Sequence, residues 1–364
     1  MRVLQEVARL LVGGLFIFSG IIKVNDPIGT AIKLEEYFEV FAYDIAPFFE
    51  LFVPAALFLS VLLSVLEVVL GVALLVGYRV KLTSWILLLM IVFFTFLTFY
   101  SAYFNKVTDC GCFGDAIKLT PWQSFKKDVI LLVFIGVIFW KKDTYQPWFG
   151  KRFREVKIIG STIFLIVIAI YAITHLPFID FRTYKVGNHL PTLMENRAPI
   201  RYMYVMEKDG KTYEFENYPS DQGYEYVSSY PINPEDEAKI TDLNVWEGDN
   251  DYTDELLRGS KLLVIIHQVE KTSLKKIDRL RNLTYSNPNY QTWILTSSGY
   301  ETFESFRHEN QLAAPYFFAD ATVLKTMVRS NPGILLLQNG TVLDKWHYND
   351  TPLSDEVIEI LNRQ

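Results

Sequence analysis

Long apolar runs alternate with short polar segments over the first half of the chain and end near Leu176. The runs are Leu10–Ile22, Phe52–Gly77, Leu82–Phe104, Val129–Trp140 and Ile158–Leu176. A helix needs about 20 predominantly apolar residues to cross a bilayer, and most of these runs approach or exceed that length. Val129–Trp140 is short, but a helix that begins at Thr120-Pro121 would be long enough. The pattern therefore predicts five membrane-spanning helices.

The helix that begins at Thr120-Pro121 would carry four polar residues before its apolar run. They are Gln123, Lys126, Lys127 and Asp128. Because charged side chains are costly in lipid, we expect these four either at the membrane interface or facing the bundle.

Lysine and arginine are distributed unevenly among the loops between the runs. The second and fourth loops contain the basic residues Arg79, Lys81, Lys141, Lys142, Lys151, Arg152, Arg154 and Lys157. The first loop instead carries the acidic residues Glu35, Glu36, Glu39 and Asp44. Cytoplasmic loops carry an excess of lysine and arginine, so the second and fourth loops are expected in the cytoplasm with the N-terminus. We therefore expect a multi-pass protein of the bacterial inner membrane whose C-terminal domain is periplasmic.

The first loop also carries a helix signal. Asp26-Pro27 is typical of a cap followed by proline in the first turn. Apolar residues then recur at helical spacing at Ile28, Ala31, Ile32, Phe38, Phe41, Ala42 and Ile45. The segment is expected to form an amphipathic helix that either lies on the outer membrane surface or packs on the end of the bundle.

The second half of the chain alternates between strand-like and helix-like segments from Ile240 onward. Predicted strands are Asp242–Trp246, Lys261–His267, Gln291–Thr296, Tyr316–Ala319, Ile334–Gln338 and Val342–Trp346; predicted helices are Tyr252–Leu257, Ser273–Tyr285, Tyr300–Asn310, Val323–Val328 and Asp355–Leu361. Asp209-Gly210 and Asn339-Gly340 are hairpin signals. The alternation predicts an α/β domain with a central sheet.

Composition agrees with two unlike parts. The mean hydropathy is +0.16 although 21% of the residues are charged. The net charge of −6 excludes a basic footprint for nucleic acid. We expect a transmembrane bundle over residues 1–142, a basic cytoplasmic loop with a fifth transmembrane helix over 143–178, a Tyr/Pro-rich connection with a hairpin over 179–239, and a soluble α/β domain over 240–364.

The only two cysteines, Cys110 and Cys112, lie in a short loop between two apolar runs. One residue apart, they are close enough for a disulfide, but the small ring would be strained and easily reduced. Two interpretations stay open: a redox-active pair, or a tight glycine turn whose cysteines do not turn over. No metal site is expected, because two thiolates supply at most half of a four-ligand set.

Glu67 falls near the middle of the second apolar run. A charge at that depth costs a few kcal/mol, so the side chain should face the bundle, pair, or be protonated. Lys23 is a possible partner, but it is expected to lie too near the membrane surface. The residue is either a proton or quinone site, or a protonated carboxyl group that is hydrogen-bonded between helices.

Three motifs carry a resemblance over roughly Leu4 to Trp140. They are Gly20-Ile21-Ile22-Lys23, Glu67 followed by Gly71, and Cys110-Gly111-Cys112-Phe113-Gly114. Together they resemble the DoxX/MauE superfamily of small membrane proteins. The resemblance implies a four-helix membrane bundle, to which this chain would add a fifth helix. It also implies a link to quinone-coupled oxidation, thiol redox chemistry or cofactor maturation.

The second half has a resemblance of its own, from Ile240 to the end. Its motifs are Thr253–Leu257 before the run Leu262–Ile266, Asp320 before a short helix, and Asn331-Pro332-Gly333 before Asn339-Gly340. They resemble the TlpA-like and peroxiredoxin-like branches of the thioredoxin fold. The resemblance implies a cis Asn331–Pro332 bond beside a groove that either binds a partner peptide or is filled by this chain's own Tyr-rich segment Phe178–Tyr230.

This resemblance departs from its family at one decisive place. The segment Gln268–Ser273 stands where a Cys-x-x-Cys motif would follow the strand. Because this half of the chain contains no cysteine, it cannot perform thiol exchange. His267 ends the strand at this point and is either a base or an ordinary histidine.

Two functions fit these observations. In the first, Cys110 and Cys112 exchange electrons with outer thiols and pass them to membrane quinone, and Glu67 handles protons. The outer domain then docks a partner protein through Asn331, Pro332 and His267. In the second, the chain is a non-enzymatic scaffold or accessory subunit of an envelope complex for secretion or protein maturation. Its degenerate thioredoxin-like domain then binds a peptide.

Overall fold

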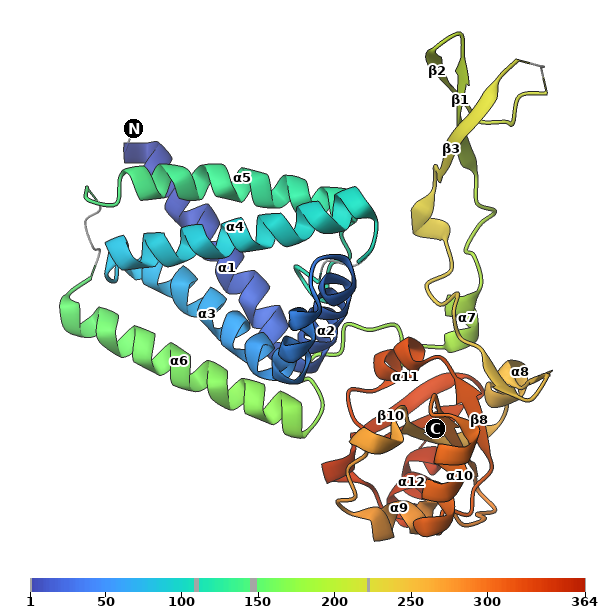
Figure 1. Ribbon diagram of the computed structural model, residues 1–364. Helices are drawn as coiled ribbons and strands as arrows, with labels where there is room; N and C mark the ends of the chain where they lie inside the picture. Colours follow the sequence, from blue (N-terminus) through green and yellow to red (C-terminus); the bar gives the residue numbers. More distant parts are fainter. Residues whose placement is uncertain (1, 108–110, 145–148, 221–222, 364) are drawn as a thin grey trace. The chain divides into compact units, whose positions relative to one another are not determined.

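The computed structural model describes residues 2–107, 111–144, 149–220 and 223–363 (Figure 1). They belong to two compact units, Met1–Arg182 and Thr183–Gln364. The first unit is helical and the second contains two β-sheets. An apolar helical part followed by an α/β part is therefore confirmed.

The first unit consists of long helices. They are α1 (Arg2–Asn25), α2 (Pro27–Asp44), the 3₁₀ helix η1 (Pro47–Ala55), α3 (Ala56–Val76), α4 (Val80–Phe104), α5 (Pro121–Trp140) and α6 (Lys151–Thr174). Figure 1 shows α5 beside α4 and α6 beside α3. Buried residues from α1, α3, α4 and α5 form one apolar core, with Leu74, Leu87 and Ile135 fully covered.

The number of candidate spans differs from the prediction of five. Among the described residues, four segments are long and apolar enough to cross a membrane: Gln5–Asn25, Pro47–Val76, Val80–Phe104 and Lys151–Thr174. The helix α5 begins at the predicted residue, where Thr120 and Gln123 form a capping box. The helix α5 is not among these four, because Lys126, Lys127 and Asp128 interrupt the apolar stretch in its first half.

Glycines allow α1 and α3 to approach closely. A Cβ atom on Gly20 would lie 2.5 Å from Val68 Cγ2, and one on Gly71 would lie 2.7 Å from the Gly13 carbonyl oxygen. Any larger residue at these positions would force the helices apart. Small residues at helix contacts in membranes allow the two backbones to approach closely. The close contact brings the face of α1 that carries Lys23 against the face of α3 that carries Glu67.

The helix α2 packs on the bundle and begins at the predicted cap. The Asp26 side chain accepts a hydrogen bond from the Gly29 amide. The buried face of α2 includes Tyr37 and Phe41, which pack against residues of α4. At the other end of α2, Lys106 Nζ lies 2.6 Å from Asp44 Oδ1. This hydrogen bond lowers the pKa of Asp44.

The second unit begins with α7 (Leu190–Met194) and a small antiparallel sheet. Its strands are β1 (Tyr202–Lys208), β2 (Lys211–Phe215) and β3 (Glu225–Pro231), in the order β2-β1-β3. The hairpin predicted at Asp209-Gly210 joins β1 and β2 and is confirmed. The strand β3 was not predicted, and nearly all its residues are exposed.

A seven-stranded sheet forms the rest of this unit, in the order β10-β9-β6-β7-β8-β4-β5. The strands are β4 (Val245–Glu247), β5 (Asn250–Asp251), β6 (Ser260–Ile266), β7 (Gln291–Thr296), β8 (Tyr316–Ala319), β9 (Gly333–Gln338) and β10 (Thr341–His347). The pairs β6/β7 and β7/β8 are parallel and the others are antiparallel. The sheet is mixed, and the predicted α/β domain with a central sheet is confirmed.

Five helices connect these strands or close the unit: α8 (Thr253–Leu256), α9 (Ile277–Leu283), α10 (Tyr300–Glu309), α11 (Ala321–Met327) and α12 (Ser354–Asn362). The helix predicted over Ser273–Tyr285 is shorter, because Lys276 has a left-handed backbone with φ 56°. The hairpin at Asn339-Gly340 has positive φ at both residues, as a type I′ turn requires. The Asn331–Pro332 bond is cis, as predicted.

Candidate functional site

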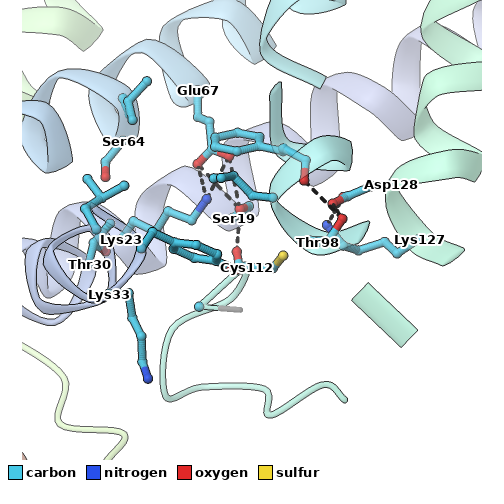
Figure 2. A pocket seen from close by; sticks show the side chains of 16 residues that line it. Ser19, Lys23, Thr30, Lys33, Ser64, Glu67, Thr98, Cys112, Lys127 and Asp128 are labelled. Atoms are coloured by element: carbon cyan, nitrogen blue, oxygen red, sulfur yellow. Dashed lines mark hydrogen bonds and ion pairs between the residues drawn. The ribbon is translucent and has the colours of Figure 1, made fainter. Parts of the chain in front are cut away.

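A small cavity lies within the first unit (Figure 2). Its volume is ≈ 70 Å³, and residues of α1, α2, α3, α4, α5 and the cysteine loop line it. The lining side chains that carry chemistry are Ser19, Lys23, Glu67, Cys112, Lys127 and Asp128. The structure thus brings two of the predicted site residues, Glu67 and Cys112, to one place.

Lys23 and Glu67 form a buried ion pair. Lys23 Nζ lies 2.9 Å from Glu67 Oε1 and 3.0 Å from Oε2. The residues are 8% and 4% exposed. The expectation that Lys23 lies too near the surface to reach Glu67 is therefore wrong. The reason is the glycine contact between α1 and α3, because Gly20 lies one turn before Lys23 and directly against Glu67 Cβ.

Ser19 connects this pair to the cysteine loop. Its Oγ donates a hydrogen bond to the Cys112 carbonyl oxygen at 2.8 Å. The same atom is 3.5 Å from both carboxylate oxygens of Glu67. Ser19 lies one turn before Lys23, so the same face of α1 holds the ion pair and the loop. The sequence offered no signal for Ser19, because a serine within an apolar run is common.

A second polar group faces the cavity from α5. Lys127 Nζ lies 2.6 Å from Asp128 Oδ1, and Thr98 Oγ1 of α4 donates to Asp128 Oδ2 at 3.0 Å. Lys127 lines the same cavity as Cys112 and Glu67. Figure 2 shows the Cys112 side chain extending from the loop toward the α5 side of the cavity. We expected the polar residues of α5 either at the membrane interface or facing the bundle, and Lys127 and Asp128 face the bundle.

The cysteine loop is described only in part. Cys110 lies outside the described residues, so the predicted disulfide with Cys112 stays a prediction. Gly111 and Gly114 have φ of 61° and 50°, a backbone that favours glycine. A Cβ atom on Gly114 would lie 3.3 Å from Ile22 Cγ2 of α1. These glycines allow the loop to turn tightly against α1.

The residues predicted to bind a peptide in the second unit are His267, Asn331 and Pro332. His267 follows β6 and lines an open pocket of ≈ 260 Å³ with Glu270, Ser297, Ser298 and Lys325 among its other residues. Its Nδ1 atom is buried and has no hydrogen-bond partner among the described residues. Burial, followed by the charges of Lys325 and Lys271, lowers the pKa of His267 to about 4. The imidazole is therefore neutral at neutral pH.

Asn331 is fixed by contacts within this unit. Its Nδ2 donates to the Gln268 carbonyl oxygen at 2.6 Å, and its backbone carbonyl accepts from the Ser273 amide at 2.9 Å. Its Oδ1 is buried without a partner among the described residues.

The helices and the polar cavity define an integral membrane protein. Residues 1–141 match the family described as Methylamine utilisation protein MauE, so the N-terminal part is MauE-like. That match includes every charged residue of the cavity and ends at α5. Residues 200–232, which contain β1 to β3, match a domain of unknown function, DUF8463. No curated protein matches the chain, and no solved structure does.

Proposed function

We propose that the first unit is a membrane thiol–disulfide exchange module. Cys110 and Cys112 would react with the thiols or disulfides of partner proteins, and the Lys23–Glu67 pair would exchange protons with them. One observation carries the proposal. Ser19 Oγ is bonded to the Cys112 carbonyl and lies 3.5 Å from both oxygens of Glu67, so the cysteine loop rests directly on a buried ion pair.

The charges around Cys112 suit a reactive thiol. A thiolate is the reacting species, and a neighbouring ammonium group favours it. Lys127 supplies that ammonium group and is held by Asp128 at 2.6 Å. When Cys110 and Cys112 reduce a partner disulfide, their two thiols give up two electrons and two protons and form a Cys110–Cys112 disulfide, while the partner disulfide breaks and takes up both to become a dithiol. Glu67 lies at the loop, where it can accept and return these protons.

Quinone is the electron acceptor that the family resemblance implies. The cavity volume of ≈ 70 Å³ is about half of the roughly 150 Å³ that accommodates benzene in a buried apolar cavity. The residues around the cavity therefore do not leave room for a quinone ring in this conformation. The proposed exchange needs only a partner disulfide or dithiol, and it includes no quinone step.

We further propose that α5 crosses the membrane as the fourth of five spans. Its 20 residues would extend about 30 Å at 1.5 Å per residue. Ser124 and Asp128 are buried in the bundle, whereas Ile130 and Val133 are exposed. The exposed polar residues of α5, Gln123 and Lys126, lie in its first two turns at the membrane interface, and Asp128 beyond them faces the bundle. Five spans then put the cysteine loop and the second unit in the periplasm.

Thiol trapping tests the proposed exchange. Membranes that contain the full chain are equilibrated with glutathione buffers of different redox poise, and free thiols are then alkylated and counted by mass spectrometry. We expect reversible interconversion of dithiol and disulfide at Cys110 and Cys112. Thiols that stay reduced at every poise would contradict the proposal, and so would a bond that no buffer reduces.

A second candidate function concerns the second unit, which we propose is thioredoxin-like and docks a partner protein. The mixed sheet supports this, with β6 parallel to β7 and antiparallel to β9, and with β9 and β10 forming a hairpin. The specific observation in favour of docking is a pair of buried polar atoms, His267 Nδ1 and Asn331 Oδ1, that lack partners among the described residues. Such atoms are costly unless a partner satisfies them.

Docking of this kind would make the chain an accessory subunit of an envelope complex even if the thiols did not turn over. Replacement of His267 by phenylalanine tests it, because the variant fills the same space without the ring nitrogens. Co-purification of partners from native membranes should weaken in this variant and persist in His308→Phe, whose histidine lies exposed on α10. Equal recovery from both variants would contradict docking at His267.

A further inference from the structure

Four helix ends meet around a pocket of ≈ 420 Å³ in the first unit. The end of α3, the start of α4, the segment after α5 and the first turn of α6 contribute to it. Its lining residues are Gly77, Arg79, Val80, Lys81, Leu82, Lys142, Asp143 and Arg154. Four of them are basic and one is acidic. The Glu67 cavity differs, because there Lys23 pairs with Glu67 and Lys127 pairs with Asp128.

The one acid leaves most of this positive charge uncompensated. Lys81 Nζ lies 2.7 Å from Asp143 Oδ1, and this hydrogen bond lowers the pKa of Asp143. Asp143 is therefore ionised and neutralises one cation. Arg79, Lys142 and Arg154 form no ion pair with any carboxylate among the described residues. Three positive charges thus face a pocket large enough for a ligand.

Among the residues that the structure describes, first-turn amides and one buried nitrogen at this pocket also have no partner. Arg79 is the N-cap of the 25-residue helix α4 but forms no side-chain cap bond, so amides of the first turn stay available at the pocket. Amides at a helix N-terminus favour an anion. Arg154 Nη1 donates to the Gly77 carbonyl at 2.7 Å, whereas its Nε is buried with no hydrogen-bond partner in the described part of the chain. A ligand that accepts hydrogen bonds would satisfy these donors.

The surroundings of the pocket indicate what carries the anion. Leu82 and Trp85 of α4 and Phe153 and Val156 of α6 are exposed within two turns of it. Both helices are candidate membrane spans. A tryptophan at the end of a span is typical of the membrane interface. The pocket therefore combines cations and helix amides with adjoining apolar surface, and basic pockets of this kind between transmembrane helices bind acidic lipid headgroups.

We propose that this pocket binds the phosphate of an anionic phospholipid whose acyl chains lie along the exposed apolar residues of α4 and α6. The phosphate oxygens would accept from Arg79, Lys142, Arg154 and the first-turn amides of α4. The site is independent of the thiol chemistry proposed for the Glu67 cavity, because the two pockets share no lining residue.

Native mass spectrometry of the delipidated full-length chain in a neutral detergent tests this site. The protein is titrated with dioleoyl phosphatidylglycerol, with dioleoyl phosphatidylcholine, or with inorganic phosphate alone. The pocket variant is R79Q/K142Q. The matched control is R152Q/K157Q, which removes the same two charge types from exposed positions of α6 outside the pocket. Melting curves of both variants check that the bundle is folded.

We expect phosphatidylglycerol to bind the wild type more tightly than phosphatidylcholine does. The pocket variant should bind phosphatidylglycerol about 30-fold more weakly. Each basic residue near an anionic headgroup contributes roughly 1 kcal/mol, and 1.4 kcal/mol corresponds to about a tenfold change in affinity. The control variant should keep its affinity. Equal binding of the two lipids by the wild type would overturn the proposal, as would equal losses in both variants. Full displacement of the lipid by inorganic phosphate would show a site for soluble phosphate instead. If the pocket variant fails to fold, the comparison of the two lipids on the wild type still decides.

Discussion

Removal of the Glu67 carboxylate should destabilise the first unit strongly. In Glu67→Gln the Lys23 ammonium would stay buried beside Phe94 without its counter-ion. Loss of one member of a buried ion pair costs about 3–5 kcal/mol, because the remaining charge is left uncompensated. Removal of both charges in K23M/E67L should restore most of that loss, since apolar residues of similar size often replace a buried pair at little cost.

The matched control for this change is Glu36→Gln. Glu36 accepts a hydrogen bond from Lys33 Nζ at 3.1 Å, and this pair is partly exposed, with side chains 29% and 40% accessible against 10% and 5% for Lys23 and Glu67. Exposed pairs contribute about 0–1 kcal/mol, so Glu36→Gln should have little effect. The assay is the free energy of unfolding of the bundle in mixed micelles, followed by circular dichroism at increasing denaturing detergent. Equal effects of the two substitutions would refute the reasoning, and so would a double variant less stable than Glu67→Gln.

Three further predictions concern the thiol, the topology and the second unit. Replacement of Lys127 by methionine should slow alkylation of Cys112 at pH 7 roughly tenfold in a Cys110→Ser background, because an adjacent cation favours the thiolate. The control is Lys126→Met, since Lys126 is exposed. Equal alkylation rates in the two variants would contradict the role of Lys127. Protease added to intact spheroplasts should remove the second unit, and full protection would contradict five spans. The pKa of His267 falls to about 4 in the folded chain, so the stability that neutral His267 contributes is present above pH 6.5 and lost as the pH falls toward 4. His267→Phe should flatten the dependence of the unfolding free energy on pH in that range. An unchanged pH dependence would contradict the burial of His267.

The sequence predicted most elements of the second unit because their signals are local. The strand β6 contains the continuous apolar run Leu262–Ile266, all of whose residues are buried, as expected of a central strand. The β9/β10 hairpin follows from Asn339-Gly340. The strand β3 lacks such a signal, because nearly all its residues are exposed and pairing with β1 alone holds it.

The polar cavity was predictable only in part. The depth of Glu67 in an apolar run and the spacing of the cysteines led us to predict Glu67 and Cys112 as site residues, and both line the cavity. Their neighbours depend on the register between helices, which neither helix encodes by itself. Lys23 reaches Glu67 because Gly20 lets α1 approach α3, and Lys127 faces Cys112 because α5 turns its polar side inward. Unsatisfied atoms such as His267 Nδ1 follow only from the packed structure.

The central claim is that the cysteine loop and the Lys23–Glu67 pair act as one redox site. The most direct test is the reduction potential of the Cys110–Cys112 couple, measured by thiol trapping between pH 6 and pH 8 in the wild type and in K23M/E67L. The account predicts a reversible couple whose potential differs between the two proteins by about 30 mV or more, the equivalent of a tenfold change in the exchange equilibrium. Identical potentials at every pH would contradict it.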